Sequence, residues 1–329
     1  MAEPGPTNSI LDVAGLKIGQ AHDEDVRTGV TVILPEDRAI CGVDVRGGGP
    51  GTRETDALPP HTLVDEIDAV VLSGGSSYGL AAADGVAAIL GAQGRGFAMM
   101  RQAGIPVSPV VPSAILYDLA NGGDKAWGET PPYAALGRAA LAAVDQPLEL
   151  GRVGAGYGAL AGSHMGGIGS ASIVTDDGYT IAAIMAVNAF GSVMIPGTEA
   201  FWAHPFEQGE EFGGQTPDAV DFDADDWGAA KINPGARENT TIGLVATDAI
   251  LTPADAQRLA IMAQTGLARA IRPAHTPFDG DTIFALSTAG KPLAEPTSLA
   301  LTRLGSLAAD CVSRAIARGV YEARNQGCD

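Results

Sequence analysis

Glycine is the feature that most restricts what this chain can fold into, because 44 of its 329 residues are Gly. Apolar and aromatic residues make up 46% of the chain, but aromatic residues only 5%. The core must therefore consist mainly of Ala, Val, Ile and Leu, and elements can approach closely wherever Gly leaves out a Cβ. We find no linker that separates two hydrophobic units, so we expect one domain over residues 1–329.

The charge balance argues against several classes of partner. Twenty basic residues face 39 acidic ones, a net charge of −19, and such a surface repels the phosphates of nucleic acids. The chain has no stretch of about 18 uncharged apolar residues and no signal-like start, so we expect a cytoplasmic protein without a membrane span. Part of the acidic excess indicates a solvated loop: Asp218, Asp221, Asp223, Asp225 and Asp226.

Cysteine and histidine spacing predicts neither a disulfide framework nor a metal site. The cysteines are Cys41, Cys311 and Cys328, and no two of them form a CxxC pair. The five histidines fall in no metal-binding pattern.

Hydrophobic runs predict a mixture of strands and helices, hence an α/β or layered α+β fold. The strands are expected at 30–34, 69–72, 181–187, 242–247 and 282–286. The helices are expected at 80–90, 113–119 and 133–144, from Thr252 to before Pro273, and at 301–315. Residues 205–239 are polar and acidic, without a clear period, and are predicted to form a long surface loop.

Two glycine-rich segments resemble known catalytic or cofactor-binding motifs. Residues 75–79 read G-x-S-x-G between a strand and a helix, so Ser76 or Ser77 could be a nucleophile with His275 as base, or the segment could be a plain turn. Residues 156–161 resemble a degenerate dinucleotide fingerprint. No clear strand precedes that run and no long helix follows it, which favours close backbone packing beside a site.

The run Glu238-Asn239-Thr240-Thr241 joins the polar segment to a buried strand. It fits a glycosylation acceptor, an ordinary strand start, or a self-cleavage junction. In the last case a Thr hydroxyl attacks the preceding carbonyl, water opens the ester, and the product begins with a free Thr. Its α-amine, with an ordinary pKa of about 8, can then act as the base, so no histidine is needed.

Asp279-Gly280-Asp281 precedes the predicted strand 282–286. Asp-Gly is a favoured turn pair, so a turn is one interpretation. The other is a pair of carboxylates that orients a nucleophile and its amine.

Together these segments resemble the DmpA/NylC family, which comprises L-aminopeptidase/D-esterases, β-aminopeptidases and nylon-oligomer hydrolases. The resemblance covers about residues 10 to 320. The matching runs occur in family order at 43–56, 72–80, 112–119, 151–156, 166–172, 187–188, 239–242 and 275–282.

The resemblance implies a four-layer αββα sandwich of the DmpA/ornithine acetyltransferase type. It also implies a precursor that cuts itself between Asn239 and Thr240 into an α chain, 1–239, and a β chain, 240–329, which stay associated. Homo-oligomers are expected, tetramers by analogy, and no cofactor. The implied activity is hydrolysis of small peptides or ω-amino amides.

The resemblance also implies roles for individual residues. Thr240 matches the nucleophile and, after cleavage, the base. Asn188 matches an oxyanion donor, and Tyr117 matches a tyrosine near it. Asp279 and Asp281 match the pair that positions the nucleophile, and both this Asp/Asp pair and the Asn-Thr-Thr junction resemble the nylon-oligomer hydrolases. Ser76 and Ser77 become structural or substrate-side residues.

One position departs from the family pattern. Members carry a lysine near the Gly166-Gly167 run, where this chain has Ser163-His164-Met165. We expect His164 or the distant Lys231 to substitute for it, or the electrostatics of the site to differ. Two alternatives to the self-processing hydrolase follow: a serine hydrolase that uses Ser76 or Ser77 with His275, and a binding protein that keeps the fold without processing.

Overall fold

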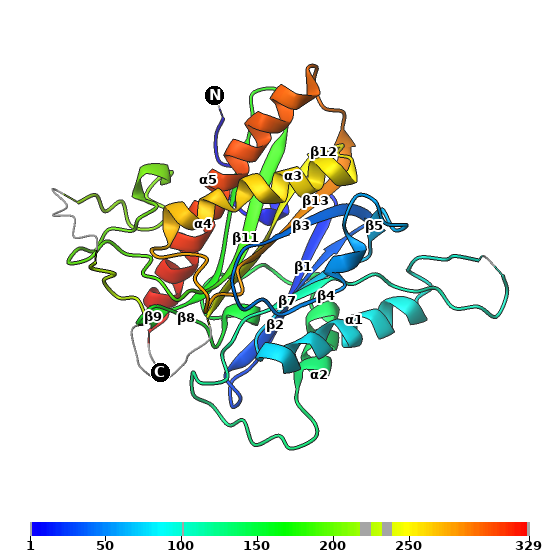
Figure 1. Cartoon of the computed structure of the whole chain (residues 1–329), viewed down its shortest axis with the longest axis horizontal. Helices are drawn as coiled ribbons and strands as arrows, with labels where there is room; N and C mark the ends of the chain where they lie inside the picture. The colour runs from blue at the N-terminus through cyan, green and yellow to red at the C-terminus, as the bar shows by residue number, and fades with distance from the viewer. Residues whose placement is uncertain (1, 101, 218–224, 232–238, 328–329) are drawn as a thin grey trace.

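The computed structural model describes residues 2–100, 102–217, 225–231 and 239–327. Two β-sheets face each other, and helices cover the outer face of each sheet (Figure 1). This four-layer α+β arrangement confirms the expected αββα sandwich. None of the helices in the described ranges is long and apolar enough to cross a membrane.

The larger sheet has six strands in the order β10-β11-β12-β13-β3-β5. Its strands are β10 (Gly167–Val174), β11 (Thr180–Asn188), β12 (Thr240–Ala249), β13 (Thr282–Lys291), β3 (Ala39–Val45) and β5 (Glu66–Ile67). Only the β12–β13 pair is parallel. Every residue of β11 and β12 is buried, because other layers cover both faces of the sheet, and this explains their nearly continuous apolar sequences.

The smaller sheet has five strands in the order β1-β2-β6-β7-β4, and a short hairpin forms a separate two-stranded sheet. The five strands are β1 (Leu16–Asp23), β2 (Thr28–Pro35), β6 (Val70–Ser73), β7 (Ser113–Ile115) and β4 (Thr52–Arg53). The hairpin pairs β8 (Leu160–Ala161) with β9 (His164–Met165).

Each sheet has its own set of helices. The smaller sheet packs against α1 (Ala81–Ala92) and α2 (Tyr133–Ala142). The larger sheet packs against α3 (Pro253–Ala263), α4 (Thr265–Ala270) and α5 (Thr297–Asn325). Short 3₁₀ helices lie in the connections: η1 (Ile10–Asp12), η2 (Thr55–Ala57), η3 (Ser76–Leu80), η4 (Gly154–Gly156) and η5 (His204–Phe206).

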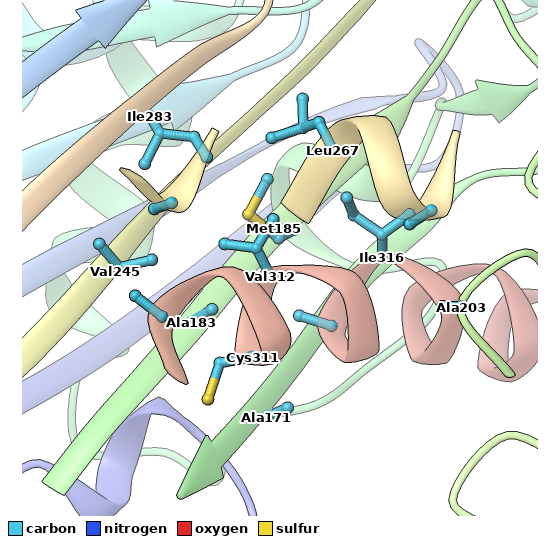
Figure 2. Close-up of a cluster of buried hydrophobic side chains, with 14 of the residues drawn as sticks. Ala171, Ala183, Met185, Ala203, Val245, Leu267, Ile283, Cys311, Val312 and Ile316 are labelled. Atoms are coloured by element: carbon cyan, nitrogen blue, oxygen red, sulfur yellow. The ribbon is translucent and has the colours of Figure 1, made fainter. Parts of the chain in front are cut away.

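Successive side chains of β11 and β12 point to opposite faces of the larger sheet and so belong to two different hydrophobic cores. Ile184 and Leu244 point between the two sheets, whereas Met185 and Val245 point toward α5. Figure 2 shows the outer cluster, in which Val312 and other α5 side chains pack over these strands. The even-numbered residues of β11 and β12 therefore face the second sheet.

Glycine allows α5 to lie directly on β10. A Cβ at Gly169 would lie 1.8 Å from the carbonyl oxygen of Ala315 and 2.5 Å from the nitrogen of Gly319, both on α5. No side chain fits at such a distance, so Gly is required there. The abundance of Gly in the sequence thus has a direct packing consequence.

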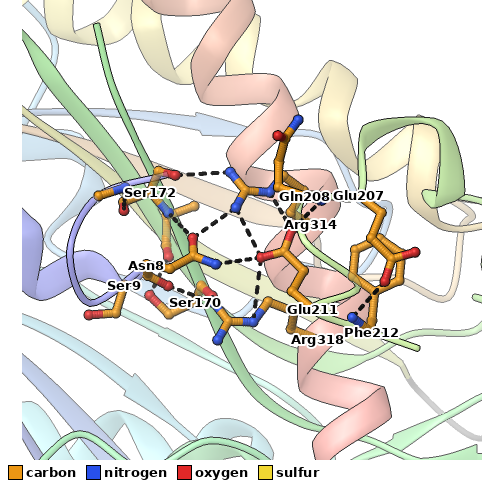
Figure 3. A network of polar contacts seen from close by, with 12 residues as sticks. Asn8, Ser9, Ser170, Ser172, Glu207, Gln208, Glu211, Phe212, Arg314 and Arg318 are labelled. Atoms are coloured by element: carbon orange, nitrogen blue, oxygen red, sulfur yellow. Dashed lines mark hydrogen bonds and ion pairs between the residues drawn. The ribbon is translucent and has the colours of Figure 1, made fainter. Parts of the chain in front are cut away.

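A buried polar network ties α5 to two distant segments (Figure 3). Arg314 has no exposed surface and forms a two-point ion pair with Glu211, at 2.5 Å and 2.9 Å. Asn8 donates to Glu211 at 2.6 Å and accepts from Arg314 at 2.8 Å. Arg318 donates to the carbonyl of Asn8 at 2.6 Å. The network holds the N-terminal segment and part of the polar segment 205–231 against α5.

All five predicted strands are confirmed, and so are the helices except the one at 113–119. That prediction is wrong: β7 starts at Ser113 and pairs with β6, because a short apolar run suits a buried strand as well as a helix. The helix after Thr252 is two helices, α3 and α4. The segment 205–239 is not purely a surface loop, since Phe212 and the Glu211 side chain are buried. Asp218, Asp221 and Asp223 lie outside the described residues.

Candidate functional site

A threonine hydroxyl and the carbonyl that precedes it lie together at the start of β12. Thr240 is buried, and its Oγ1 donates to the carbonyl oxygen of Asn239. The backbone N–H of Gly280 donates to that carbonyl oxygen at 3.0 Å and to Thr240 Oγ1 at 3.1 Å. The N–H of Asn239 donates to the carbonyl of Phe278 at 2.8 Å. The hydroxyl is therefore beside a carbonyl whose oxygen already accepts a backbone hydrogen bond.

The strand register brings Asn188 to this hydroxyl. Asn188, the last residue of β11, lies directly opposite Thr240 in the antiparallel ladder. Directly opposite residues have Cβ atoms about 5 Å apart on the same face of the sheet. Here that face is the one toward the second sheet, since Ala186 and Ile242 belong to the core between the sheets.

The Asn188 side chain has a defined orientation. Its Oδ1 accepts from the N–H of Leu160 at 2.9 Å and from Lys231 Nζ at 3.4 Å. Its Nδ2 donates to the carbonyl of Tyr117 at 2.9 Å, so Tyr117 contacts Asn188 through its backbone. An amide nitrogen carries two hydrogens, and within the described residues no acceptor takes up the second one. That hydrogen could bind a developing oxyanion.

Asp279 is a buried carboxylate one residue from Gly280. Its Oδ2 accepts from the N–H and the hydroxyl of Thr276 at 2.8 Å and 2.6 Å, and its Oδ1 accepts from the N–H of Phe190 at 3.3 Å. Burial and, second, the like charge of Asp281 raise the pKa of Asp279 to about 6. The group therefore titrates at mildly acidic pH, well above an ordinary aspartate.

Asp281 connects the start of β12 to a histidine. Its Oδ1 accepts from the N–H of Thr241 at 2.9 Å. Its Oδ2 accepts from the backbone N–H of His275 at 3.0 Å and lies 2.9 Å from His275 Nδ1. Asp281 thus fixes the start of β12, and the Asp-Gly-Asp run serves both as a turn and as a contact surface for Thr240 and Thr241.

A glycine loop closes over these carboxylates. The N–H of Gly49 donates to the carbonyl of Asp279 at 2.8 Å, and the N–H of Arg46 donates to the carbonyl of Asp281 at 2.9 Å. A Cβ at Gly47 would lie 2.2 Å from the carbonyl oxygen of Asp279. The close approach requires Gly in this loop.

A second buried acid, Asp118, supports the segment that contacts Asn188. It accepts from the N–H of Gly75 at 2.8 Å and from the Thr28 hydroxyl at 2.6 Å. Burial raises the pKa of this carboxyl. Because Asp118 follows Tyr117, these bonds fix the carbonyl that holds the Asn188 amide. No pattern in the sequence marks Asp118 as a site residue, because its role depends on contacts with distant segments.

The structure does not assemble a serine–histidine pair from Ser76 or Ser77 and His275. Ser76 begins η3, and its N–H donates to the carbonyl of Leu116 at 3.0 Å. His275 Nδ1 lies 2.9 Å from Asp281 Oδ2. Among the described residues, neither serine forms a hydrogen bond with His275. The G-x-S-x-G segment forms a strand-to-helix turn.

The glycine run at 154–162 packs closely beside the site. A Cβ at Gly156 would lie 2.4 Å from the nitrogen of Ile168, on β10. The run contains η4 and β8 and is not followed by a long helix, so the described residues lack the strand–turn–helix context of a dinucleotide site.

This chain lacks the lysine that the family pattern places near Gly166, and His164 and Lys231 are the two candidates to replace it. Of these two residues, Lys231 contacts Asn188. Its Nζ is 3.4 Å from the backbone oxygen and 3.4 Å from the Oδ1 of Asn188. His164 lies in β9 near Arg324 and Glu199, and burial followed by the Arg324 charge lowers its pKa. A positive charge therefore adjoins Asn188 although it comes from another part of the chain.

Among the described residues, the cysteine thiols and the possible metal ligands do not form a second reactive site. Burial raises the pKa of Cys41 and Cys311 to about 12, so both thiols stay protonated near neutral pH. Within the described ranges, no group of three or more His, Cys, Asp or Glu side chains could hold a metal ion.

Comparison with known proteins gives one family and several relatives. The family model described as Peptidase family S58 matches residues 8–328. An uncharacterised aminopeptidase of Mycobacterium tuberculosis is 44% identical over 339 residues, covering 96% of this chain and 94% of the relative. A 6-aminohexanoate-oligomer endohydrolase of an Agromyces species is 31% identical over 296 residues, covering 84% of this chain and 74% of the relative.

Two solved structures share the fold. A β-aminopeptidase of a Burkholderia species has a TM-score of 0.70 at 24% identity, covering 97% of this chain and 88% of the other. An L-aminopeptidase D-Ala-esterase/amidase of Ochrobactrum anthropi, described as a variant of the Ntn-hydrolase fold, has a TM-score of 0.71 at 22% identity, with coverages of 97% and 87%.

Proposed function

Because the chain belongs to peptidase family S58, which makes it a hydrolase of peptide or amide bonds, we propose that Thr240 is its nucleophile and that the chain first cuts itself. The observation that carries the proposal is the contact between the Thr240 hydroxyl and the carbonyl of Asn239. The Gly280 N–H on the same oxygen supports it, since a donor there stabilises the negative charge that develops during attack.

Self-cleavage takes two steps. Thr240 Oγ1 bonds to the carbonyl carbon of Asn239, the peptide C–N bond breaks, and the hydroxyl proton passes to the departing nitrogen. Water then hydrolyses the ester, which leaves a carboxyl group on Asn239 and a free hydroxyl and amine on Thr240. The products are the α chain, 1–239, and the β chain, 240–329.

The mature enzyme repeats this chemistry on a substrate. The Thr240 α-amine takes the hydroxyl proton, Oγ1 attacks the substrate carbonyl, and the substrate amine leaves with a proton. Water then releases the acid from the acyl-enzyme ester. Asn188 is suited to donate its amide hydrogen to the oxyanion, since it lies opposite Thr240.

The charged groups around Thr240 have supporting roles. Asp281 holds the N–H of Thr241 and so positions the nucleophile strand, while Asp279 holds the loop that carries Gly280. Lys231 takes the part of the lysine that the family pattern places near residue 164. Its charge at Asn188 Oδ1 polarises the amide toward the reacting carbonyl.

The substrate class that we propose is small peptides or ω-amino amides. The names of the relatives support this range, because they include an aminopeptidase and an endohydrolase of 6-aminohexanoate oligomers. A panel of aminoacyl amides and 6-aminohexanoate oligomers, tested with the mature protein, distinguishes the two ends of the range.

The two chains should remain associated after the cut. In the precursor, β12 and β13 lie inside the larger sheet, between β11 and β3 of the prospective α chain. Separating them would expose buried strands on both sides. We also expect homo-oligomers, with a tetramer as the first hypothesis, and sedimentation of the mature protein measures this.

Substitution of the nucleophile tests the proposal. Thr240→Ala should leave one uncut chain without amidase activity, whereas Thr240→Ser should still cut, because a hydroxyl remains. A Thr240→Ala protein that is cut and active would contradict the proposal. Labelling of Ser76 or Ser77 by a fluorophosphonate, with loss of activity on their replacement by Ala, would favour the serine-hydrolase alternative instead.

A further inference from the structure

The precursor marks where a substrate's acyl group must lie. In self-cleavage the acyl group of Asn239 becomes esterified to Thr240 Oγ1, and in catalysis the substrate's acyl group becomes esterified to the same atom. The surroundings of Asn239 are therefore the surroundings of the acyl group. Asn239 lies alongside Phe278, whose carbonyl accepts its N–H at 2.8 Å.

Phe278 is one of three aromatic rings, from separate segments, that contact one another beside Asp279. The rings of Phe190 and Phe278 are stacked with centroids 5.6 Å apart, and the ring of Trp227 meets Phe190 edge-on at 6.3 Å. Phe278 directly precedes Asp279, and the N–H of Phe190 donates to Asp279. Phe190 and Phe278 are thus within two residues of the proposed catalytic groups Asn188 and Asp279, and Trp227 joins them through its contact with Phe190.

Two of these rings are open to solvent. Phe278 is 49% exposed and Trp227 39% exposed, in a chain with only 5% aromatic residues. Contiguous exposed apolar surface beside a reactive group is typical of a ligand site. The carboxylates of Asp279 and Asp281 are only 2% exposed and already accept protein hydrogen bonds, so neither adds a charge to the exposed faces of Phe278 and Trp227.

We propose that Phe190, Trp227 and Phe278 form an acyl-side subsite that selects amides with an aryl or large alkyl acyl group. This inference rests on the proposed function, because it takes Thr240 as the nucleophile. Aromatic walls suit such a group, since ring-to-ring and ring-to-alkyl contacts remove apolar surface from water on both partners.

The subsite should survive processing although Trp227 belongs to the segment before the cut. That segment is tied to the body of the fold at two points. The N–H of Lys231 donates to the carbonyl of Phe190 at 2.8 Å, and the N–H of Ser163 donates to the carbonyl of Ala229 at 2.8 Å. Trp227 is therefore held by contacts upstream of residues 232–238.

Matched substrates with one leaving group test the subsite. The substrates are phenylalanyl- and glycyl-4-nitroanilide, and the variants are Trp227→Ala and Phe278→Ala in the mature protein. We expect kcat/KM for the phenylalanyl substrate to fall about ten-fold or more, with the glycyl substrate and self-cleavage unchanged. Trp227→Phe should keep most of the preference. Leu299→Ala, which removes an exposed apolar side chain beyond the opposite end of β13, should change neither substrate.

Equal losses on both substrates, or no loss on either, would overturn the subsite. If the wild type hydrolyses neither nitroanilide, the proposed activity fails on these substrates. The subsite is then tested by the binding of a ligand that carries the same aryl group. Calorimetry with the acid 3-phenylpropanoate should then show affinity at least ten-fold weaker for Trp227→Ala than for wild type. Equal affinity would refute the subsite independently of the activity.

Discussion

Asn188 and Thr240 face each other across the ladder between β11 and β12, although they belong to opposite sides of the proposed cut. Hydrogen bonds to Leu160, Lys231 and Tyr117 set the direction of the Asn188 amide. The antiparallel register, rather than sequence proximity, therefore brings an amide donor to the hydroxyl. A slip of one residue would turn either side chain to the other face of the sheet.

The charge of Lys231 should matter through Asn188. Lys231→Met removes an ammonium group 3.4 Å from Asn188 Oδ1. A hydrogen bond to a charged group contributes roughly 1.5–3 kcal/mol, so we expect kcat of the mature protein to fall about ten- to hundred-fold, with a smaller change in KM. Steady-state kinetics measures this, and Lys231→Arg should recover part of the loss. Lys17→Met, which removes a surface ion pair with Asp145, is the control. Unchanged kcat in Lys231→Met would contradict the role.

Asp279 should give the precursor a pH-dependent stability. Its pKa in the folded protein, about 6, exceeds the ordinary 3.8, chiefly because of burial and then because of the Asp281 charge. The folded state therefore binds this proton more tightly, and the free energy of unfolding falls as pH rises from about 4 to about 6.

Urea denaturation of uncut Thr240→Ala protein measures this slope, with and without Asp279→Asn. Between about pH 4 and about pH 6, the unfolding free energy of the protein with Asp279 should fall by about 2 kcal/mol relative to that of the protein with Asp279→Asn. Parallel curves from pH 4 to 7 would show that Asp279 keeps an ordinary pKa.

Gly280→Ala should slow self-cleavage. A Cβ there would lie 2.7 Å from Thr240 Oγ1 and 2.9 Å from the carbonyl oxygen of Gly49, so the hydroxyl must move. Misplacement of a reacting atom by about 1 Å can cost on the order of a hundred-fold in rate. A time course of the two chains on denaturing gels gives the rate. Gly290→Ala is the control, because its nearest contacts, at 3.4 Å and 3.7 Å, are ordinary ones. Cleavage of Gly280→Ala at the wild-type rate would refute the geometry.

The Glu211–Arg314 pair should be essential to stability. Glu211→Ala leaves a fully buried arginine without its main anionic partner, and we expect a loss of about 3–5 kcal/mol in unfolding free energy. Glu199→Ala breaks the exposed pair with Arg324 and should cost about 0–1 kcal/mol. Chemical denaturation compares the two substitutions, each made in the uncut Thr240→Ala protein. Similar small losses would mean that the buried pair is dispensable.

Sequence patterns predicted the parts of the fold whose signals are local. The buried strands β11 and β12 are continuous apolar runs, and Thr252 with Pro253 marks the start of α3. β10 was not predicted, because its glycines hide the strand pattern. Gly169 is required because α5 packs directly on it. No local sequence signal reveals this contact, since α5 lies more than a hundred residues further along the chain.

The same limit holds for the site. The Asp-Gly-Asp run and the Asn239–Thr240 junction are visible in the sequence, and the resemblance to a family assigns roles to them. The position of Lys231 beside Asn188 and the backbone donor of Gly280 depend on how distant segments meet. Neither a side-chain distance nor a backbone N–H direction is encoded in residue identity.

Denaturing mass spectrometry of freshly purified protein, with N-terminal sequencing of any smaller chain, tests the central claim most directly. We predict two chains, the smaller beginning Thr-Thr-Ile-Gly at Thr240, and a single uncut chain for Thr240→Ala. One intact wild-type chain after long incubation, or a cut at another bond, would contradict self-cleavage by Thr240.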